Sequence, residues 1–130
     1  MLGKFFQKPG KEEGDRVPPG QHLAKGFPVL TYGATPQVST EEWEFKVWGL
    51  AKPQTFTWSD FMALPQHEFT ADFHCVTRWS KLDVKWTGIK VIDFMNAIEV
   101  DPKAAHVMEH CYGGYTTNIA MEDFVREENF

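Results

Sequence analysis

Closely spaced turn-forming residues are the feature that most limits what this chain can fold into. Glycine and proline interrupt the apolar pattern so often that no apolar run approaches the ~20 residues of a membrane helix. The breaks fall at residues 33–36, 49–53, 65, 86–88, 101–102 and 113–114. Because only short elements fit between them, we expect a mixed α+β domain with a substantial sheet.

The spacing of apolar residues assigns a type to each short segment. Strands are expected where apolar residues alternate, at 43–48, 68–76, 105–111 and 115–120. Helices are expected where the spacing is helical, at 58–64, 89–99 and 121–128. Thr57 or Ser59 is the expected cap of the first helix, and Thr87, in a turn at 86–88, that of the second. A loop is expected at 77–80, and the last two strands form a hairpin around a glycine pair.

The length and the ends of the chain suggest one domain with an extension. The 130 residues suffice for one domain with a real core. Residues 1–20 are rich in Lys, Glu, Gly and Pro, which predicts a flexible N-terminal arm before a domain over 21–130. No secretory signal is visible, so the expected location is the cytoplasm.

Charge and composition exclude some classes of partner. Lys and Arg number 13 against 18 Asp and Glu, so the net charge is −5. This argues against a nucleic-acid surface, which needs a basic stripe, and against an anionic membrane surface. Aromatic residues make up 15% of the chain, with 11 Phe and 5 Trp, so we expect a small core built mostly from rings.

The two cysteines, Cys75 and Cys111, each directly follow a histidine. A buried, structural thiol is one interpretation of Cys75. A thiolate ligand or nucleophile is the other, because the neighbouring Arg78, Lys81 and His74 would lower the pKa of the thiol. A zinc site made of His74, Cys75, His110 and Cys111 is a third hypothesis, although strand alternation separates each His-Cys pair.

Several segments resemble one enzyme family. The sequence FHCVTRWS at residues 73–80, with WTGI at 86–89, is similar to the cofactor segment of the sulfite oxidase-like molybdopterin oxidoreductases, above all the small bacterial members without a haem domain. The segments RVPPGQ, GFPVLTYG, WEFKVWGL and GYTTN resemble other parts of the family in the same order. The resemblance implies the β-rich, mixed α+β fold of that family.

The resemblance also implies a cofactor and a reaction. In the family a cysteine binds molybdenum through sulfur, and Cys75 is the matching position. The implied reaction is a two-electron oxygen-atom transfer on a small S- or N-oxide type substrate, with electrons passed to a redox partner. Arg78 is the candidate for binding an oxyanion of substrate or cofactor. The candidates for contacts with the cofactor are Tyr32, Gly33, His74, Cys75 and Thr77.

The end of the chain leaves a second function open. Family members continue past the GYTT segment with strands and with basic residues that hold the pterin phosphate. This chain ends at residue 130, so we expect the front portion of the domain, incomplete at its C-terminus. The alternative to an oxidoreductase is a cofactor-free, shortened homologue that acts as a binding module or as a homo-oligomer, joined through the surface that the missing portion leaves.

Overall fold

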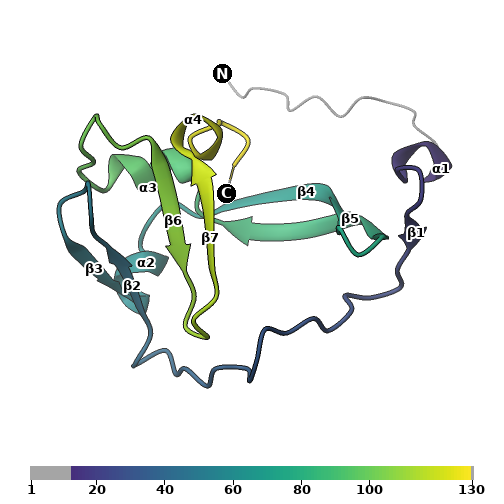
Figure 1. Ribbon diagram of the computed structural model, residues 1–130, viewed down its shortest axis with the longest axis horizontal. Helices are drawn as coiled ribbons and strands as arrows, with labels where there is room; N and C mark the ends of the chain where they lie inside the picture. The colour runs from purple at the N-terminus through teal and green to yellow at the C-terminus, as the bar shows by residue number, and fades with distance from the viewer. Residues whose placement is uncertain (1–12, 130) are drawn as a thin grey trace. The chain divides into compact units, whose positions relative to one another are not determined.

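The computed structural model describes residues 13–129, which form two compact units (Figure 1). The first unit consists of residues 13–29 and 69–86, and the second of residues 30–68 and 87–129. Within the described residues, short strands outnumber short helices. This confirms the expected mixed α+β class.

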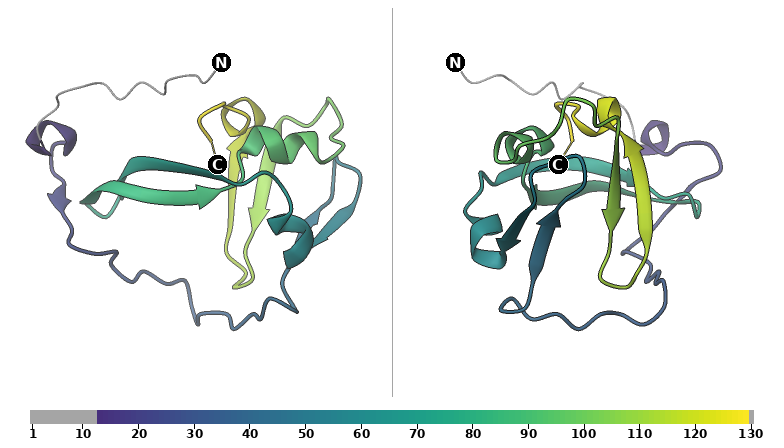
Figure 2. Two further views of the ribbon diagram at one scale, coloured as in Figure 1. Left: turned by 180° about the vertical axis from the view of Figure 1, so that it is seen from behind. Right: turned by 60° about the vertical axis from the view of Figure 1, so that its left-hand side comes forward.

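The first unit is built on a three-stranded sheet with the order β1-β5-β4. Strands β4 (His67–His74) and β5 (Trp79–Gly88) run side by side as a long hairpin (Figures 1 and 2). Strand β1 (His22–Leu23) pairs with β5 in parallel and completes the sheet. A single helical turn, α1 (Glu13–Arg16), precedes β1. The sheet therefore joins the N-terminal segment to the hairpin.

Aromatic rings pack the core of the first unit. Phe73 stacks on Trp79 with 5.4 Å between ring centroids, and the edge of Phe27 meets Trp79 at 5.8 Å. Trp79 is 5% exposed and Val84 is 8% exposed. Because rings bury a large area each, a few of them anchor this small unit, as the composition predicted.

The second unit contains two antiparallel hairpins. Strands β2 (Glu44–Val47) and β3 (Gln54–Thr57) form the first, with Phe45 opposite Phe56. Strands β6 (His106–His110) and β7 (Thr116–Ala120) form the second, which confirms the expected hairpin around the glycine pair.

Three short helices complete the second unit: α2 (Trp58–Met62), α3 (Val91–Asn96) and α4 (Met121–Phe124). Thr57 caps α2, because its hydroxyl accepts from the Asp60 N–H at 3.2 Å while the Asp60 carboxylate accepts from the Thr57 N–H at 3.0 Å. This reciprocal capping box satisfies two N–H groups that a helix start would otherwise leave unpaired. The expected cap at Thr57 is confirmed.

A second ring cluster forms the core of this unit. Phe45 lies 5.2 Å from Phe61 and 5.3 Å from Phe94, and Phe56 lies 5.7 Å from Phe94, all between ring centroids. Phe56 is 5% exposed, and Val91 is 8% exposed. The rings thus join β2 and β3 to α2 and α3.

Several expected boundaries are wrong. The expected loop at 77–80 is a turn at 75–78, and Trp79 and Ser80 already belong to β5. The expected turn at 86–88 is the end of β5, so Lys90, and not Thr87, precedes the helix. Pairing with β4 carries β5 through these residues, and local turn preference cannot reveal such pairing.

The helices are also shorter than expected, and three strands among the described residues were missed. Helix α3 ends at Asn96 and α4 at Phe124. Strands β1, β3 and β5 were not expected. Strands β1 and β3 are too short to show alternation by themselves, and β5 depends on its pairing with β4. No helix among the described residues is long and apolar enough to cross a membrane. The cytoplasmic location and the arm over residues 1–20 stay predictions.

Candidate functional site

Cys75 lies in the turn that joins β4 to β5. Its N–H donates to the Trp79 carbonyl at 2.9 Å, and its own carbonyl accepts from the Arg78 N–H at 3.0 Å. These two bonds close a three-residue hairpin loop over residues 76–78. The cysteine is therefore held at the end of a strand ladder, which is a more rigid mount than a free loop.

The surroundings of the Cys75 sulfur favour the thiolate. The side chain is partly exposed, and its Sγ lies 3.2 Å from the Thr77 hydroxyl oxygen. The hydrogen bond with that hydroxyl lowers the pKa of Cys75, and the backbone N–H groups of Thr77 and Val76 lower it further, against a smaller opposing effect of burial. Since the thiolate is the form that binds metals and attacks electrophiles, this thiol is prepared for either role.

Arg78 adopts a conformation that is costly for a residue with a side chain. Its φ is +70°, in the left-handed region that glycine occupies without penalty. Strain of this kind, worth on the order of 1 kcal/mol, concentrates at binding and active sites. The exposed guanidinium has a planar fork that suits oxyanions, so the geometry fits the expected role of Arg78.

A chain of hydrogen bonds supports the Cys75 turn from behind. Gln21 donates from Nε2 to the Cys75 carbonyl at 3.0 Å, and its Oε1 accepts from the Ser80 hydroxyl at 3.2 Å. The Ser80 oxygen lies 2.8 Å from Nδ1 of His74. Ser80 is fully buried, whereas His74 is exposed. The side chain of Gln21 thus links the cysteine to the histidine beside it.

The N-terminal segment is also fixed to the same hairpin by charge. Arg16 binds Asp72 through two hydrogen bonds, Nε to Oδ2 at 3.0 Å and a terminal nitrogen to Oδ1 at 2.5 Å, and it reaches Asp83 at 2.7 Å. The hydrogen bonds from Arg16 lower the pKa of Asp72 and raise that of Arg16. A bidentate pair is the stronger kind of surface ion pair, so it helps to place Gln21 against the Cys75 turn.

The other two expected cofactor contacts lie in the second unit. Tyr32 is 67% exposed, and its ring meets Tyr115 at 5.2 Å between centroids. Gly33 has a φ of +72°, which explains why glycine stands there. The structure places His74, Cys75, Thr77 and Arg78 at one turn of the first unit, and the roles of all six residues stay predictions.

The zinc hypothesis gains no support. Within residues 13–129, no group of three or more His, Cys, Asp or Glu side chains is placed to hold a metal ion. His110 instead lies against Trp48, with 5.1 Å between ring centroids, and Cys111 is an exposed free thiol. A single soft ligand, Cys75, is what the described site offers to a metal.

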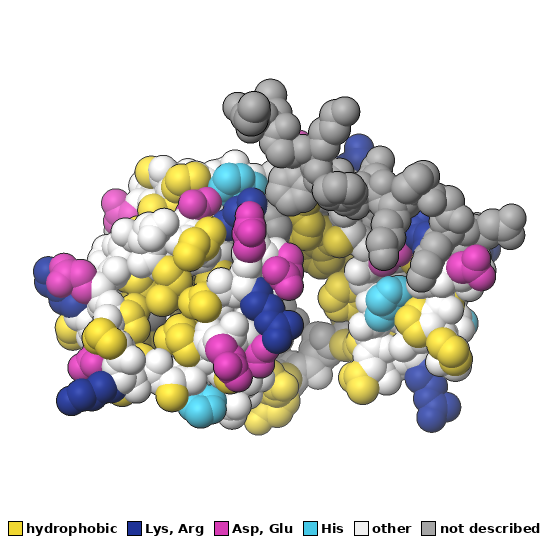
Figure 3. All heavy atoms as spheres, turned by 90° about the horizontal axis from the view of Figure 1, so that it is seen from above, with side chains coloured by type: hydrophobic (Ala, Val, Ile, Leu, Met, Phe, Trp, Pro, Cys, Tyr) yellow, Lys and Arg dark blue, Asp and Glu magenta, His cyan; other side chains and the backbone are white. Residues whose placement is uncertain are grey.

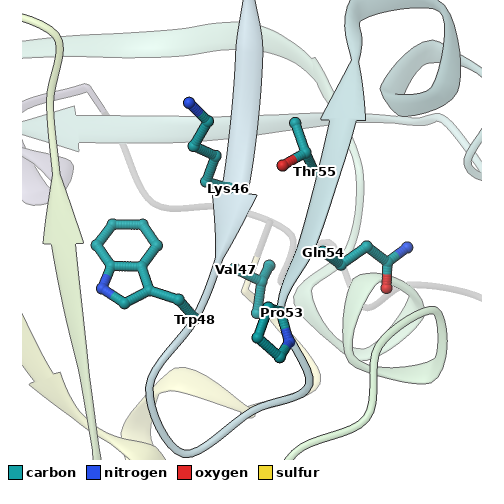
Figure 4. A pocket seen from close by; sticks show the side chains of 6 residues that line it. All are labelled: Lys46, Val47, Trp48, Pro53, Gln54 and Thr55. Atoms are coloured by element: carbon teal, nitrogen blue, oxygen red, sulfur yellow. The ribbon is translucent and has the colours of Figure 1, made fainter.

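Two surface hollows lie outside the Cys75 turn. One of about 310 Å³ lies beside β2 and β3 in the second unit (Figure 4), lined by Lys46, Val47, Trp48, Pro53, Gln54 and Thr55. Another of about 420 Å³ in the first unit is lined by residues 23–25 and 81–83. Both are open to solvent and combine no reactive groups. The site is therefore assigned by the chemistry of the Cys75 turn and not by concavity.

Apolar side chains reach the surface in both units. Figure 3 shows hydrophobic side chains exposed on the visible face of the molecule. Val76, in the Cys75 turn, is 94% exposed, and Val29 is 90% exposed. Such residues are candidates for contact with a ligand or with further polypeptide.

Sequence reasoning missed the residues behind the turn. Gln21 and Ser80 lie inside the segments that carry the family resemblance, but nothing in their spacing shows that they meet. Ser80 is a small polar residue that stands between Trp79 and Lys81, so its neighbours along the chain do not indicate that it is buried. Such a residue, once buried, must find hydrogen-bond partners.

Comparison with known proteins agrees with the chemistry of the turn. The family model described as oxidoreductase molybdopterin binding domain matches residues 32–130, which include the whole Cys75 turn. The uncharacterized oxidoreductase YuiH of Bacillus subtilis (strain 168) is 36% identical over 118 residues. That match covers 89% of this chain and 60% of YuiH, so the chain spans about 60% of the length of this curated relative. No solved structure matches the chain. The chain belongs to the sulfite oxidase-like family of molybdopterin-binding oxidoreductase domains.

Proposed function

We propose that this protein acts as a molybdenum-dependent oxidoreductase in which the Cys75 thiolate binds the metal of a molybdopterin cofactor. The Cys75 turn is the observation that carries the proposal. It presents a partly exposed sulfur at the end of a hydrogen-bonded hairpin, with the pKa of the thiol lowered mainly by Thr77. The family membership supports the cofactor class.

The residues of the turn fit such a group. A thiolate is a soft ligand, which suits a transition metal better than it suits a hard cation. Metal binding requires the deprotonated thiol, and the lowered pKa of Cys75 reduces the cost of losing that proton. Cys75 Sγ is thus the protein atom that would hold the metal, and Thr77 would orient it through the 3.2 Å contact.

The remaining residues of the turn have roles in binding. When bound, the cofactor would supply oxygen-atom transfer on a small S- or N-oxide type substrate. Arg78 would hold an oxyanion of substrate or cofactor, because its guanidinium forms paired hydrogen bonds with such groups. A redox partner would then take up or deliver the electrons. Association of the chain with itself or with further polypeptide belongs to the same proposal, since Val29 and Val76 are almost fully exposed.

The molybdenum content of two cysteine variants tests the proposal. The full chain and its Cys75→Ser and Cys111→Ser variants would be purified from a host that makes the cofactor, and molybdenum and pterin would be measured in each. Replacing Cys75 is expected to lower the molybdenum content by roughly tenfold or more, as loss of metal-site residues does. Cys111 is the matched control, because it is also a free cysteine after a histidine.

The outcomes separate the proposal from its alternative. Equal molybdenum loss in both cysteine variants would mean that Cys75 has no special role. Absence of both molybdenum and pterin from the unmodified chain, together with elution as a dimer or larger species in size-exclusion chromatography, would favour the cofactor-free, self-associating module.

A further inference from the structure

We propose that Gln21 and Ser80 fix neutral His74 in the tautomer that carries its proton on Nδ1, so that Nε2 offers a hydrogen-bond acceptor beside Cys75. The group that meets His74 then brings an N–H donor, as the amino and ring N–H groups of a pterin do. The ligand part of this inference rests on the proposed function. The tautomer part does not, because it concerns the protein alone.

The orientation of the Gln21 amide is the first step. A side-chain amide has one end that donates and one that accepts. One end lies 3.0 Å from the Cys75 carbonyl oxygen, which can only accept. That end must therefore be Nε2, because an oxygen placed there would face another acceptor. The other end, Oε1, then points to Ser80 at 3.2 Å.

The proton of Ser80 is the second step. Because Oε1 of Gln21 can only accept, the Ser80 hydroxyl must donate its one proton to it. The Ser80 oxygen is then left as an acceptor for its other neighbour, Nδ1 of His74 at 2.8 Å. Ser80 is fully buried, so water cannot take the place of either partner.

The histidine is the last step. Since the Ser80 oxygen accepts, Nδ1 of His74 must carry a proton. In the neutral ring, Nε2 then has a free lone pair. His74 is exposed, and Nε2 lies on the side of the ring away from the buried Ser80. The Cys75 carbonyl can only accept a hydrogen bond, and this fixes the direction of each hydrogen bond through Gln21, Ser80 and His74. The result is a hydrogen-bond acceptor, Nε2 of His74, at the surface.

Nitrogen NMR on the full chain tests the tautomer directly. Long-range proton–nitrogen spectra of protein with 15N-labelled histidine, in mildly alkaline buffer where histidine side chains are neutral, distinguish the two ring nitrogens. The His74→Gln variant identifies the His74 signals by their loss. We expect Nδ1 to be the protonated nitrogen of His74. Finding the proton on Nε2 in the unmodified protein would overturn the inference.

Two replacements of Gln21 separate positioning from plain structural support. Gln21→Met leaves the Ser80 hydroxyl free to donate to Nδ1, so His74 is expected to move its proton to Nε2. Gln21→Glu keeps an acceptor for Ser80 while losing the donor to Cys75, so the Nδ1–H form is expected to survive. The same tautomer in both variants would contradict the mechanism, because a merely structural role predicts no difference between them.

Ser80→Ala covers the case in which Gln21→Met does not fold. This variant removes the acceptor for Nδ1 by an independent route, so the proton is expected on Nε2, the form that an unconstrained histidine side chain prefers. An unchanged tautomer in Ser80→Ala would overturn the inference even without data from Gln21→Met.

The pterin content of His74 variants tests the ligand part. Gln at this position retains an acceptor oxygen, whereas Leu of similar size has none. We expect His74→Leu to retain roughly three- to tenfold less pterin than His74→Gln, the value of one hydrogen bond. Equal pterin content in the two variants would refute the donor contact and leave the tautomer result intact. Failure of the proposed function itself would show differently, as absence of pterin from the unmodified chain.

Discussion

Two hairpin ends in this protein share one architecture and differ in what surrounds them. In the first, Cys75 N–H binds the Trp79 carbonyl and the Cys75 carbonyl accepts from Arg78. In the second, which joins β6 to β7, Cys111 N–H binds the Tyr115 carbonyl at 2.9 Å and the Cys111 carbonyl accepts from Gly114 at 2.9 Å. Each cysteine follows a histidine. The backbone path of the turn and the His-Cys pair are therefore not what distinguishes the candidate site.

The left-handed position of the turn shows the first difference. Gly114 occupies it with a φ of +82°, without steric cost. Arg78 occupies the same position with a φ of +70° and bears the strain of a side chain there. The two turns therefore share a backbone conformation and differ in the side chain that this position carries, and the binding role of Arg78 stays a prediction.

The residue after the turn shows the second difference. Trp79 is 5% exposed and packs on Phe73, whereas Tyr115 is 49% exposed and meets Tyr32. The buried tryptophan fixes the Cys75 turn to a core, while the Cys111 turn lies at a wet surface. The two hairpin turns have the same backbone hydrogen bonds, but only the Cys75 turn is anchored to a buried ring.

Removing the anchor of each hairpin is expected to give the largest effect. Trp79→Ala should lower the free energy of unfolding by roughly 3–5 kcal/mol, because it empties a packed ring site. Tyr115→Ala should lower it by about 1 kcal/mol or less, because that ring is half exposed. Urea denaturation of the two variants measures the difference.

Trp79→Phe is the control for ring packing. Among the described residues, the buried Nε1 of Trp79 has no hydrogen-bond partner, so losing that N–H removes an unsatisfied group. Trp79→Phe should lower the free energy of unfolding by less than about 2 kcal/mol. Equal losses for Trp79→Ala and Tyr115→Ala would break the comparison of a buried with an exposed anchor.

Substitutions at the left-handed position are expected to change the free energy of unfolding in opposite directions in the two turns. Gly114→Ala should destabilise the protein by about 1 kcal/mol, since alanine resists a positive φ. Arg78→Gly should stabilise it by up to about 1 kcal/mol through relief of the same strain. Arg78→Ala, which keeps the strain without the guanidinium, is the control. A loss of stability in Arg78→Gly as large as in Gly114→Ala would show that Arg78 is not strained.

Removing the hydroxyl beside the thiol is expected to give the smallest effect. Thr77→Val deletes the main contact that lowers the pKa of Cys75, so that pKa should rise and less thiolate should be present at neutral pH. Alkylation of Cys75 by iodoacetamide, followed by mass spectrometry across pH, should slow severalfold near neutrality, and its midpoint should move to higher pH.

The same sample contains the control for this measurement. The rate at Cys111 should not change in Thr77→Val, because that cysteine lies in the other hairpin. Thr77→Ser, which restores a hydroxyl, should recover the reactivity of Cys75. If the pH profile of Cys75 alkylation is the same in both Thr77 variants as in the unmodified protein, Thr77 does not lower the pKa of Cys75.

The sequence predicted well the features that depend on neighbours along the chain. The Thr57 cap and the hairpin around Gly113 and Gly114 follow from side chains a few residues apart, and both are confirmed. Strand β5 was missed, because it depends on pairing with β4. The short strand β1 was missed for the same reason, since its partner lies more than fifty residues away.

The candidate site divides in the same way. The segment around Cys75 indicated the family, and the position of the cysteine where an expected strand enters a loop made it a candidate ligand from the sequence. That Gln21 contacts the Cys75 carbonyl, or that Ser80 joins Gln21 to His74, could not be read from spacing. These contacts join residues 54 and 59 positions apart.

The sequence by itself determined the class of the fold, the hairpin around Gly113 and Gly114 and the chemical types at the site, because these depend on local backbone preference and on side-chain chemistry. Only the tertiary structure decided which of the two His-Cys turns is anchored to a ring core, and which is supported by a buried serine and a distant glutamine. Burial and hydrogen-bond direction depend on segments that the fold brings together. Those two quantities make one of two similar turns a candidate metal site.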